Sequence, residues 1–225
     1  MIDDKRHSRA EGISVVADPV EKAEAEVRNG FRQYDLVIAM AQDAIDRGKF
    51  KLRPSAVLSL HREALRDLSA YAGNYRPAGV EIQKSRHKPP GAHLVPELVE
   101  EMSDYVNENW EKATAIHLAS YVMWRLNWIH PFDDGNGRTS RAVSFLVLMV
   151  KAGIVFTGPN SIPEQISADR SGYYTALDAA DEAAALGKTD VSAMEELMSG
   201  MLAKQLLSIY SKAGGSTGAA PSVFS

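Results

Sequence analysis

The sequence contains no cysteine, and charge of neither sign dominates it. The absence of cysteine excludes a disulfide framework, thiolate zinc sites and cysteine nucleophiles, and it is typical of a reducing compartment. With 25 basic and 29 acidic residues, the formal net charge is only -4. A chain with this balance is not built to coat nucleic acid, so any anion site must be a small local cluster of basic residues.

Long apolar runs are also missing. The most apolar stretch, residues 143–150, is far too short to cross a bilayer, and the charged residues within 3–9 leave no apolar core for a signal peptide. We therefore expect a cytoplasmic protein that acts on neither a membrane nor a nucleic acid. Apolar residues still make up 45% of the 225 residues, which is enough for one packed domain with short appendages.

Apolar residues recur at helical spacing along most of the sequence, which predicts an all-α fold. The most apolar predicted helix lies between Gly137 and Gly153, and we expect it to be buried at the centre of a helical bundle. The preceding helix should end near Ile129, because the residue before Pro131 is disfavoured in the α region. His130 then lies at a helix end. A further single helix is predicted over residues 163–186.

Strand character is confined to residues 79–90, where Val80 and Ile82 alternate with polar residues before two prolines. This pattern predicts either a short β-hairpin or an extended connector. The last residues are rich in Gly, Ser, Ala and Pro and have too little apolar content to fold alone. The predicted organisation is an N-terminal helical region at 1–53, a core domain at 54–212 and a flexible tail at 213–225.

Most of the candidate chemistry lies in twelve residues between two predicted buried helices, His130-Pro-Phe-Asp-Asp-Gly-Asn-Gly-Arg-Thr-Ser-Arg141. Gly135 and Gly137 allow a tight turn with exposed backbone N–H groups, and the following helix adds the positive end of its dipole. Arg138 and Arg141 are close enough on that helix to hold different oxygens of one polyphosphate. The segment therefore predicts an anion site.

Two further side chains of this segment suit a reaction at a phosphate. Asp134 would contact phosphate only through a divalent cation, and Mg²⁺ is the ion that one carboxylate and phosphate oxygens hold. His130 is a candidate proton acceptor, because imidazole titrates near neutral pH. Taken singly, each feature is more often structural, and their combination in a fixed order is what favours a site. The six histidines show no spacing typical of a zinc site, which disfavours a metal hydrolase.

The twelve residues match the signature His-Pro-Phe-x-(Asp/Glu)-Gly-Asn-Gly-Arg-x-x-Arg at every defined position, so the chain resembles the Fic-domain family, most of whose members are AMP transferases. The resemblance extends over about residues 54–185 and implies a Fic-type helical bundle with a β-hairpin flap at 76–90. It implies that His130 deprotonates a target hydroxyl, that Asp134 holds Mg²⁺ on ATP, and that Phe132 is a core anchor. The phosphates would be bound by Gly135, Asn136, Gly137, Arg138 and Arg141.

The same resemblance implies contacts outside the signature. The flap is expected to pair with an extended segment of a protein substrate at about 79–88. Tyr173 and Tyr174 match tandem tyrosines that contact the nucleoside, and Asp181 stands where the family has asparagine. Because a carboxylate only accepts hydrogen bonds whereas asparagine also donates, the preference for a base stays open. The flap residues expected beside the nucleotide are Ile82, Gln83, Lys84 and Ser85.

Residues 7–12, His-Ser-Arg-Ala-Glu-Gly, resemble the family's inhibitory motif, (Ser/Thr)-x-x-x-Glu-(Gly/Asn), of the subgroup with an N-terminal inhibitory helix. His7 departs from the first position, and Ser8 follows it as a neighbouring hydroxyl. Glu11 is expected to occupy Arg141 and to keep the γ-phosphate out of its productive position, because two anions compete for one guanidinium. The alternative is an ordinary capping box formed by Ser8 and Glu11.

Taken together, the residues and the resemblance predict a protein adenylyltransferase that moves AMP from ATP, with Mg²⁺, to a Tyr, Thr or Ser hydroxyl of a protein. Glycine at position 137 favours nucleotidyl transfer, because the family's kinase-like branch has lysine there. Autoinhibition by Glu11 and removal of AMP at the same site are expected additions. Two alternatives stay open, a catalytically silent nucleotide-sensing module and transfer of another phosphate-linked group such as phosphocholine. A homo-oligomer also stays open.

Overall fold

The computed structural model describes residues 6, 8, 9, 15, 16 and 18–214. The chain is mostly helical, with a short 3₁₀ helix, η1 (Ala92–Leu94), and two strands, β1 (Ser8–Arg9) and β2 (Glu81–Ile82). The helices are α1 (Pro19–Arg47), α2 (Pro54–Leu65), α3 (Val95–Glu108), α4 (Ala115–Ile129), α5 (Asn136–Ala152), α6 (Ile162–Ala168), α7 (Ser171–Ala185) and α8 (Ser192–Lys212). No helix among these residues is both long and apolar enough to cross a membrane.

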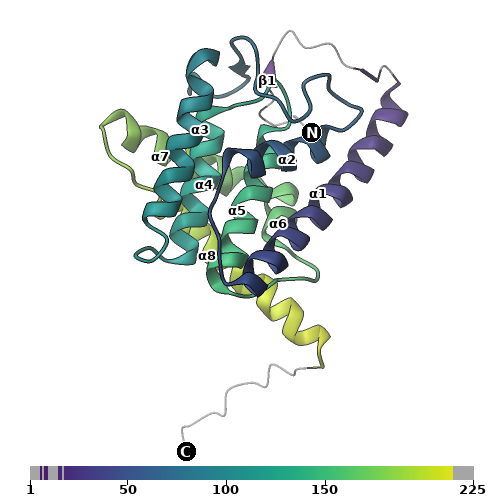
Figure 1. The fold of residues 1–225 in the computed structure, drawn as a ribbon, viewed down its shortest axis with the longest axis vertical. Coiled ribbons are helices and arrows are strands. Elements are labelled where there is room, and N and C mark those ends of the chain that lie inside the picture. The colour runs from purple at the N-terminus through teal and green to yellow at the C-terminus, as the bar shows by residue number, and fades with distance from the viewer. Residues whose placement is uncertain (1–5, 7, 10–14, 17, 215–225) are drawn as a thin grey trace, which may run out of the picture.

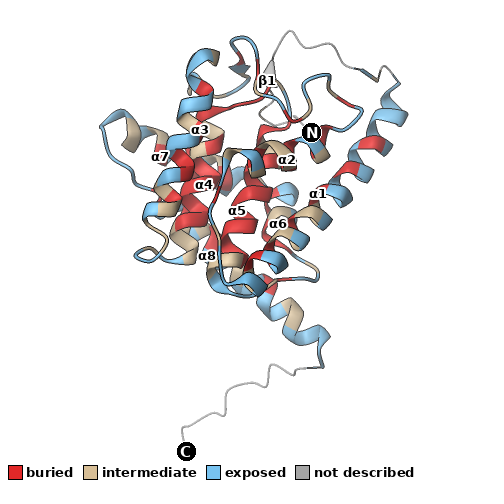
Figure 2. Ribbon diagram, in the orientation of Figure 1, coloured by how far each residue is buried: buried red, intermediate tan, exposed pale blue. Residues whose placement is uncertain are grey.

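Helix α5 is the centre of the bundle, as its apolar composition predicts. Every residue from Thr139 to Met149 is buried, and the helix packs along α4 and against α1 and α2 (Figures 1 and 2). A helix that is enclosed on all sides needs apolar side chains around its whole circumference. Gly153 ends α5 in the left-handed region with φ +68°, a conformation that glycine adopts without strain. The predicted all-α bundle with a buried central helix is confirmed.

Helix α4 ends where the sequence predicts. Its last residue is Ile129, and His130 caps it in the left-handed region, with φ 51° and ψ 59°. The backbone N–H of His130 donates to Leu126 O at 3.0 Å, which closes the last turn. Pro131 cannot continue the helix, so the chain turns sharply and starts α5 only six residues later. The turn therefore lies between two buried helices.

The predicted helix at 163–186 is in fact two helices, α6 and α7. The break falls at Asp169, whose Oδ1 accepts hydrogen bonds from the Ser171 N–H at 3.0 Å and from the Ser171 hydroxyl at 2.8 Å. An aspartate that bonds to the backbone two residues on competes with helical hydrogen bonding, so the helix restarts at this point. Arg170 consequently lies at the N-terminus of α7.

The flap is not a hairpin among the described residues. Strand β2 pairs antiparallel with β1, with Ser8 opposite Ile82 and Arg9 opposite Glu81. After Ile82 the chain turns at Lys84, which has φ +60°, and it then runs to two prolines that lack the N–H needed for a returning strand. In Figure 1, β1 lies beside the flap although about seventy residues separate them along the chain.

Arg76 holds both ends of the flap in place. Its side chain is buried, and it donates hydrogen bonds to His130 O at 2.8 Å, to Ala78 O at 2.8 Å and to Pro90 O. The Arg76 N–H also donates to Pro131 O at 2.9 Å. One residue thus connects the base of the flap to the turn between α4 and α5. The domain limits at 53/54 and 212/213 stay predictions, and the tail beyond Gly214 lies outside the described residues.

Candidate active site

A cavity of about 550 Å³ lies at the turn between α4 and α5. This volume is in the usual range for small-molecule sites. It gathers predicted residues from three regions of the chain, namely His130, Asp134, Gly135, Asn136, Gly137, Arg138 and Arg141 of the signature, Ile82 and Ser85 of the flap, and Tyr173, Tyr174 and Asp181 of α7. Gln83 and Lys84 are exposed and do not line it, because the flap turns at Lys84. Glu11 lies outside the described residues.

The turn owes its shape to Asn136. Its side-chain oxygen accepts from the Phe132 N–H at 2.9 Å, and its side-chain nitrogen donates to Phe132 O at 2.8 Å. Asn136 is buried, so its amide clamps the turn from inside. Both polar atoms of this side chain thus bond to the backbone of the turn, and the expected contact of Asn136 with a phosphate stays a prediction.

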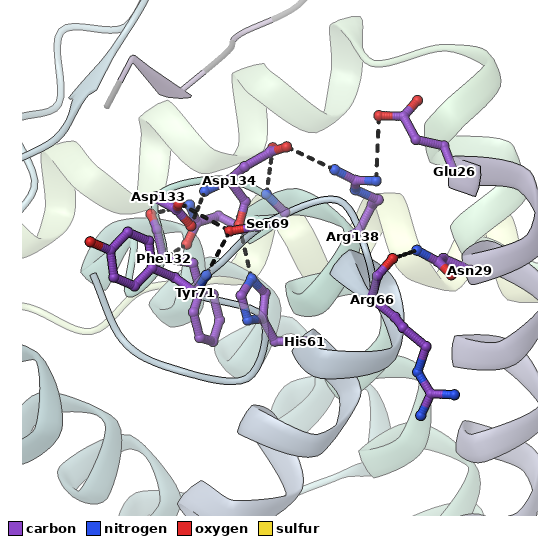
Figure 3. A network of polar contacts seen from close by, with 12 residues as sticks. Glu26, Asn29, His61, Arg66, Ser69, Tyr71, Phe132, Asp133, Asp134 and Arg138 are labelled. Carbon is purple, nitrogen blue, oxygen red and sulfur yellow. Dashed lines mark hydrogen bonds and ion pairs between the residues drawn. The ribbon is translucent and has the colours of Figure 1, made fainter. Parts of the chain in front are cut away.

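His61, which sequence reasoning missed, supports the turn from below (Figure 3). Its ring stacks on the fully buried Phe132 with 3.6 Å between centroids, which confirms Phe132 as a core anchor. His61 Nδ1 accepts from the Gly73 N–H at 3.0 Å, so Nε2 carries the hydrogen and donates to Asp134 O at 3.1 Å. Burial lowers the pKa of His61 to about 4, and the ring is therefore neutral near pH 7.

Glycine is favoured at the two positions of the turn for different reasons. Gly135 has φ +77°, and a Cβ there would lie 2.3 Å from Leu65 Cδ2, so a larger residue is both strained and obstructed. Gly137 has ordinary helical backbone, but a Cβ on it would lie 3.1 Å from Arg141 Nη1. Glycine at 137 therefore leaves room for the Arg141 guanidinium beside the first turn of α5.

The two arginines of the signature differ in their partners. Arg138 contacts Asp134 Oδ2 at 3.1 Å and Glu26 Oε1 of α1 at 3.7 Å (Figure 3). Arg141 is 9% exposed and has neither a hydrogen bond nor an ion pair with the residues that the structure describes. Burial lowers the pKa of Arg141, and the charges of Arg170 and Arg138 lower it further. Among the residues that the structure describes, the pocket thus contains a buried cation without a counterion, which is the complement of an anionic ligand.

His130 is held in the tautomer that a proton acceptor needs. Its Nδ1 lies 3.2 Å from Asn127 O, and because a carbonyl only accepts, Nδ1 carries the hydrogen and Nε2 keeps its lone pair. The ring is 6% exposed and lines the pocket. Burial lowers the pKa of His130 to about 4, so the ring is neutral across the physiological range.

The α7 side of the pocket is a set of connected polar and aromatic groups. Tyr173 is buried and its hydroxyl accepts from Asn127 Nδ2 at 2.8 Å. Asp181 Oδ1 accepts from the indole nitrogen of Trp124 at 2.8 Å, and its Oδ2 lies 3.9 Å from His87 Nδ1. Burial raises the pKa of Asp181. Lining residues that the sequence did not single out are Arg6, Lys22, Glu26, His87, Asn127, Trp128, Arg170 and Leu177.

The N-terminal segment also reaches this side. The Arg6 guanidinium contacts both carboxylate oxygens of Asp178, at 2.8 and 2.6 Å, and lies 4.5 Å from the centre of the Tyr174 ring. The Arg6 N–H donates to the Tyr174 hydroxyl at 3.0 Å. No sequence signal marks this contact, because its partners are more than 165 residues apart along the chain.

Metal binding by protein groups alone is not supported among the described residues. They contain no cluster of three or more His, Asp or Glu that could hold an ion. Asp134 offers a single carboxylate, which suits a cation that takes its other ligands from phosphate oxygens and water. The donor set therefore fits Mg²⁺ carried by a nucleotide.

Residues 51–148 match the family model described as the Fic/DOC family. The chain is 33% identical over 136 residues to the protein adenylyltransferase Fic of Drosophila willistoni and 34% identical over 136 residues to that of Drosophila persimilis. Each match covers 60% of this chain, and 26% and 25% of the relatives, so the match spans about a quarter of their length.

Solved structures show the same fold. A Fic domain containing signaling protein from Bacteroides thetaiotaomicron has a TM-score of 0.67 at 20% identity, over 91% of this chain and 78% of that one. Fic-1 from C. elegans has a TM-score of 0.66 at 21% identity, over 89% of this chain and 56% of that one. At these identities the likeness concerns the fold alone.

Proposed function

We propose that this protein is a protein adenylyltransferase, because residues 51–148 match the Fic/DOC family model. The oxygen of a Tyr, Thr or Ser hydroxyl on a target protein attacks the α-phosphorus of ATP. The bond from that phosphorus to the β-phosphate oxygen breaks, pyrophosphate leaves, and AMP stays on the target. The observation that carries the proposal is a buried Arg141 that has no counterion among the described residues, in the same cavity as a neutral His130.

His130 is the proposed base. The contact of Nδ1 with Asn127 O supports the tautomer in which Nε2 accepts the hydroxyl proton. Its low pKa, about 4, means that almost no ring is protonated before the reaction begins, at the cost of a weaker base. Arg76 donates to the backbone carbonyl of His130 and would thereby keep the His130 backbone in position.

The phosphates are assigned to the turn and to the start of α5. Arg138 and Arg141 supply two guanidinium groups, and the N-terminus of α5 adds the backbone N–H of Gly137. The Gly135 N–H, which donates to Asp134 Oδ1 at 2.5 Å, would exchange that contact for a phosphate oxygen. Asp134 would hold Mg²⁺, which when bound supplies positive charge to the phosphate oxygens. Arg138 would exchange its contacts with Asp134 and Glu26 for phosphate oxygens. Asn136 acts by shaping the turn.

The nucleoside is assigned to α7, where Tyr173, Tyr174 and Asp181 line the cavity. Asp181 is already fixed by the Trp124 indole, so it presents acceptor oxygens toward donors of a base or ribose. The target is assigned to the edge of the flap at 79–88, where an extended segment would pair with β2. We further propose that the protein is cytoplasmic and that Glu11 inhibits it by occupying Arg141.

Incubation with ATP labelled on the α-phosphate and Mg²⁺ tests the function. We expect weak labelling of protein by the wild type, strong labelling by Glu11→Gly, and none by His130→Ala. Lys49→Ala, an exposed position just after the C-terminal end of α1 that does not line the cavity, serves as the control and should match the wild type. Nucleotide binding without any transfer by Glu11→Gly would instead support a sensor module.

Two additional arms address the remaining alternatives. Release of AMP from labelled protein after removal of ATP would support removal of AMP from the target at this same site. If the target is labelled from a choline-linked nucleotide donor and not from ATP, the reaction is phosphocholine transfer rather than AMP transfer. Absence of transfer from either donor by Glu11→Gly would refute the enzymatic proposal.

A further inference from the structure

The cavity is lined by four arginines of the described chain, and they differ in charge compensation. Arg6 and Arg138 each contact a carboxylate, as described above. Among the described residues, Arg141 and Arg170 have no carboxylate partner, and neither guanidinium forms a hydrogen bond. Arg170 Nε is moreover buried and has no hydrogen-bond partner in the part of the chain that the structure describes. A polar donor left in this state costs free energy unless a ligand satisfies it.

These two guanidinium groups line the same cavity. The charge of Arg170 is one of the factors that lower the pKa of Arg141, so the two cations repel each other across the cavity. Arg141 comes from α5, whereas Arg170 is the N-cap residue of α7, whose positive helix end adds to the same field. An anion bound by both groups would relieve the repulsion.

We propose that Arg170 is a third phosphate-binding residue, which holds with Arg141 the terminal phosphate of the nucleoside triphosphate. The inference rests on the proposed function and extends it. With Arg138 and Arg141 on α5 and Arg170 on α7, the phosphates are bound from two helices. A cavity built in this way should bind a nucleoside triphosphate more tightly than the monophosphate. It would discriminate ATP from AMP through the β- and γ-phosphates, which AMP lacks.

Calorimetric titration with Mg²⁺ and either ATP or AMP tests this inference, using the full chain with Glu11→Gly to remove the proposed inhibitor. We expect Arg170→Gln to weaken ATP binding by about tenfold or more, the value of a charge-assisted hydrogen bond, and to leave AMP binding unchanged. Arg170→Lys keeps the charge but not the fork and should be intermediate. Arg47→Gln, at the exposed end of α1, is the matched control.

The outcomes separate cleanly. Equal weakening of ATP and AMP by Arg170→Gln, with an unchanged unfolding temperature, would mean that Arg170 only shapes the cavity, which overturns the inference. Unchanged ATP affinity would overturn it as well. Failure of the Glu11→Gly parent to bind either nucleotide would overturn the proposed function itself. If Arg170→Gln does not fold, the comparison of ATP with AMP is made on Arg170→Lys.

A second inference rests on a different observation, the position of the N-terminal segment. Strand β1 occupies the edge of β2, and Arg6 is fixed to α7 by Asp178 and Tyr174. The Arg6 side chain is 17% exposed and its two contacts with Asp178 are parallel, which is the strong form of this ion pair. Ser8 and Arg9 thus pair with the flap, and Arg6 contacts α7 and lines the cavity.

The geometry points to this segment as a tethered competitor of the protein substrate. Only one strand can pair with the edge of β2 that β1 occupies, so a target that pairs with this edge must first displace Ser8–Arg9. Arg6 would also have to leave Tyr174, which the proposed function assigns to the nucleoside. This inference also rests on the proposed function. It differs from inhibition by Glu11, because it involves Arg6, Ser8 and Arg9 and the edge of β2 rather than a contact with Arg141.

Hydrogen exchange read by mass spectrometry tests the competition, with Arg6→Gln and Asp178→Asn in the Glu11→Gly background. Each should raise exchange at residues 79–85 and increase AMP labelling of added unfolded casein severalfold, while Arg47→Gln changes neither. Unchanged exchange at 79–85 in both variants would overturn the inference. Raised exchange with unchanged labelling, measured against an active Glu11→Gly parent, would also overturn it.

Discussion

Substitution of Arg76 by methionine should loosen the flap and the turn that carries His130 together. Methionine keeps an apolar stem of similar length and removes the charge. The hydrogen bonds of the guanidinium to the carbonyls of His130, Ala78 and Pro90 are then lost. Burial also lowers the pKa of Arg76, which shows that the buried charge itself carries a desolvation cost.

The magnitude follows from these opposing effects. Hydrogen bonds to a charged group contribute about 1.5–3 kcal/mol each, and removal of the buried charge returns part of that sum. We therefore expect a net loss of about 3 kcal/mol in the free energy of unfolding. For a chain of this size, that corresponds to a fall of about 10 °C in Tm.

Thermal denaturation and hydrogen exchange at residues 76–90 measure the two parts of this prediction. Arg86→Met, an exposed position on the same flap, is the matched control and should behave as the wild type. Arg76→Lys should recover part of the stability, because a lysine can reach one of the three carbonyls. An Arg76→Met protein with the Tm and flap exchange of the wild type would refute the reasoning.

Three further predictions concern the turn and the α7 side. The pKa values of His130 and His61 are lowered to about 4, whereas both rings titrate near 6.5 in the unfolded chain. The free energy of unfolding should therefore be constant above pH 7 and fall from pH 6.5 toward pH 4, by on the order of 3 kcal/mol per ring. Urea denaturation at several pH values checks this, and a flat profile would contradict it. Gly135→Ala should cost about 1–3 kcal/mol through its positive φ and its close approach to Leu65, and unchanged urea unfolding would show that the turn relaxes freely. Asp181→Asn keeps an acceptor for the indole nitrogen, so stability should hold while the ratio of ATP to GTP binding changes; calorimetry measures that ratio, and an unchanged ratio would separate Asp181 from base recognition.

Several parts of the fold and the site depend only on residues that are close together along the chain, and they can therefore be predicted from the sequence. Pro131 ends α4 through local sterics, and the apolar circumference of α5 predicts a central helix. The turn with Gly135 and the two signature arginines is likewise a property of one short segment. Residues of this kind lie within one or two helical turns of each other, so spacing alone brings them together.

Contacts between distant segments were decided only in the tertiary structure. Alternation at 79–82 predicts a strand but not its partner, which is β1 rather than a returning hairpin. His61, Arg76 and Arg170 have no spacing that links them to the signature, yet packing brings each to the turn or to the cavity. Asn136 matches the signature, but only the folded turn shows its amide bonded inward to Phe132. The physical reason is that hydrogen bonding and charge compensation depend on distance in space, whereas a sequence records distance along the chain.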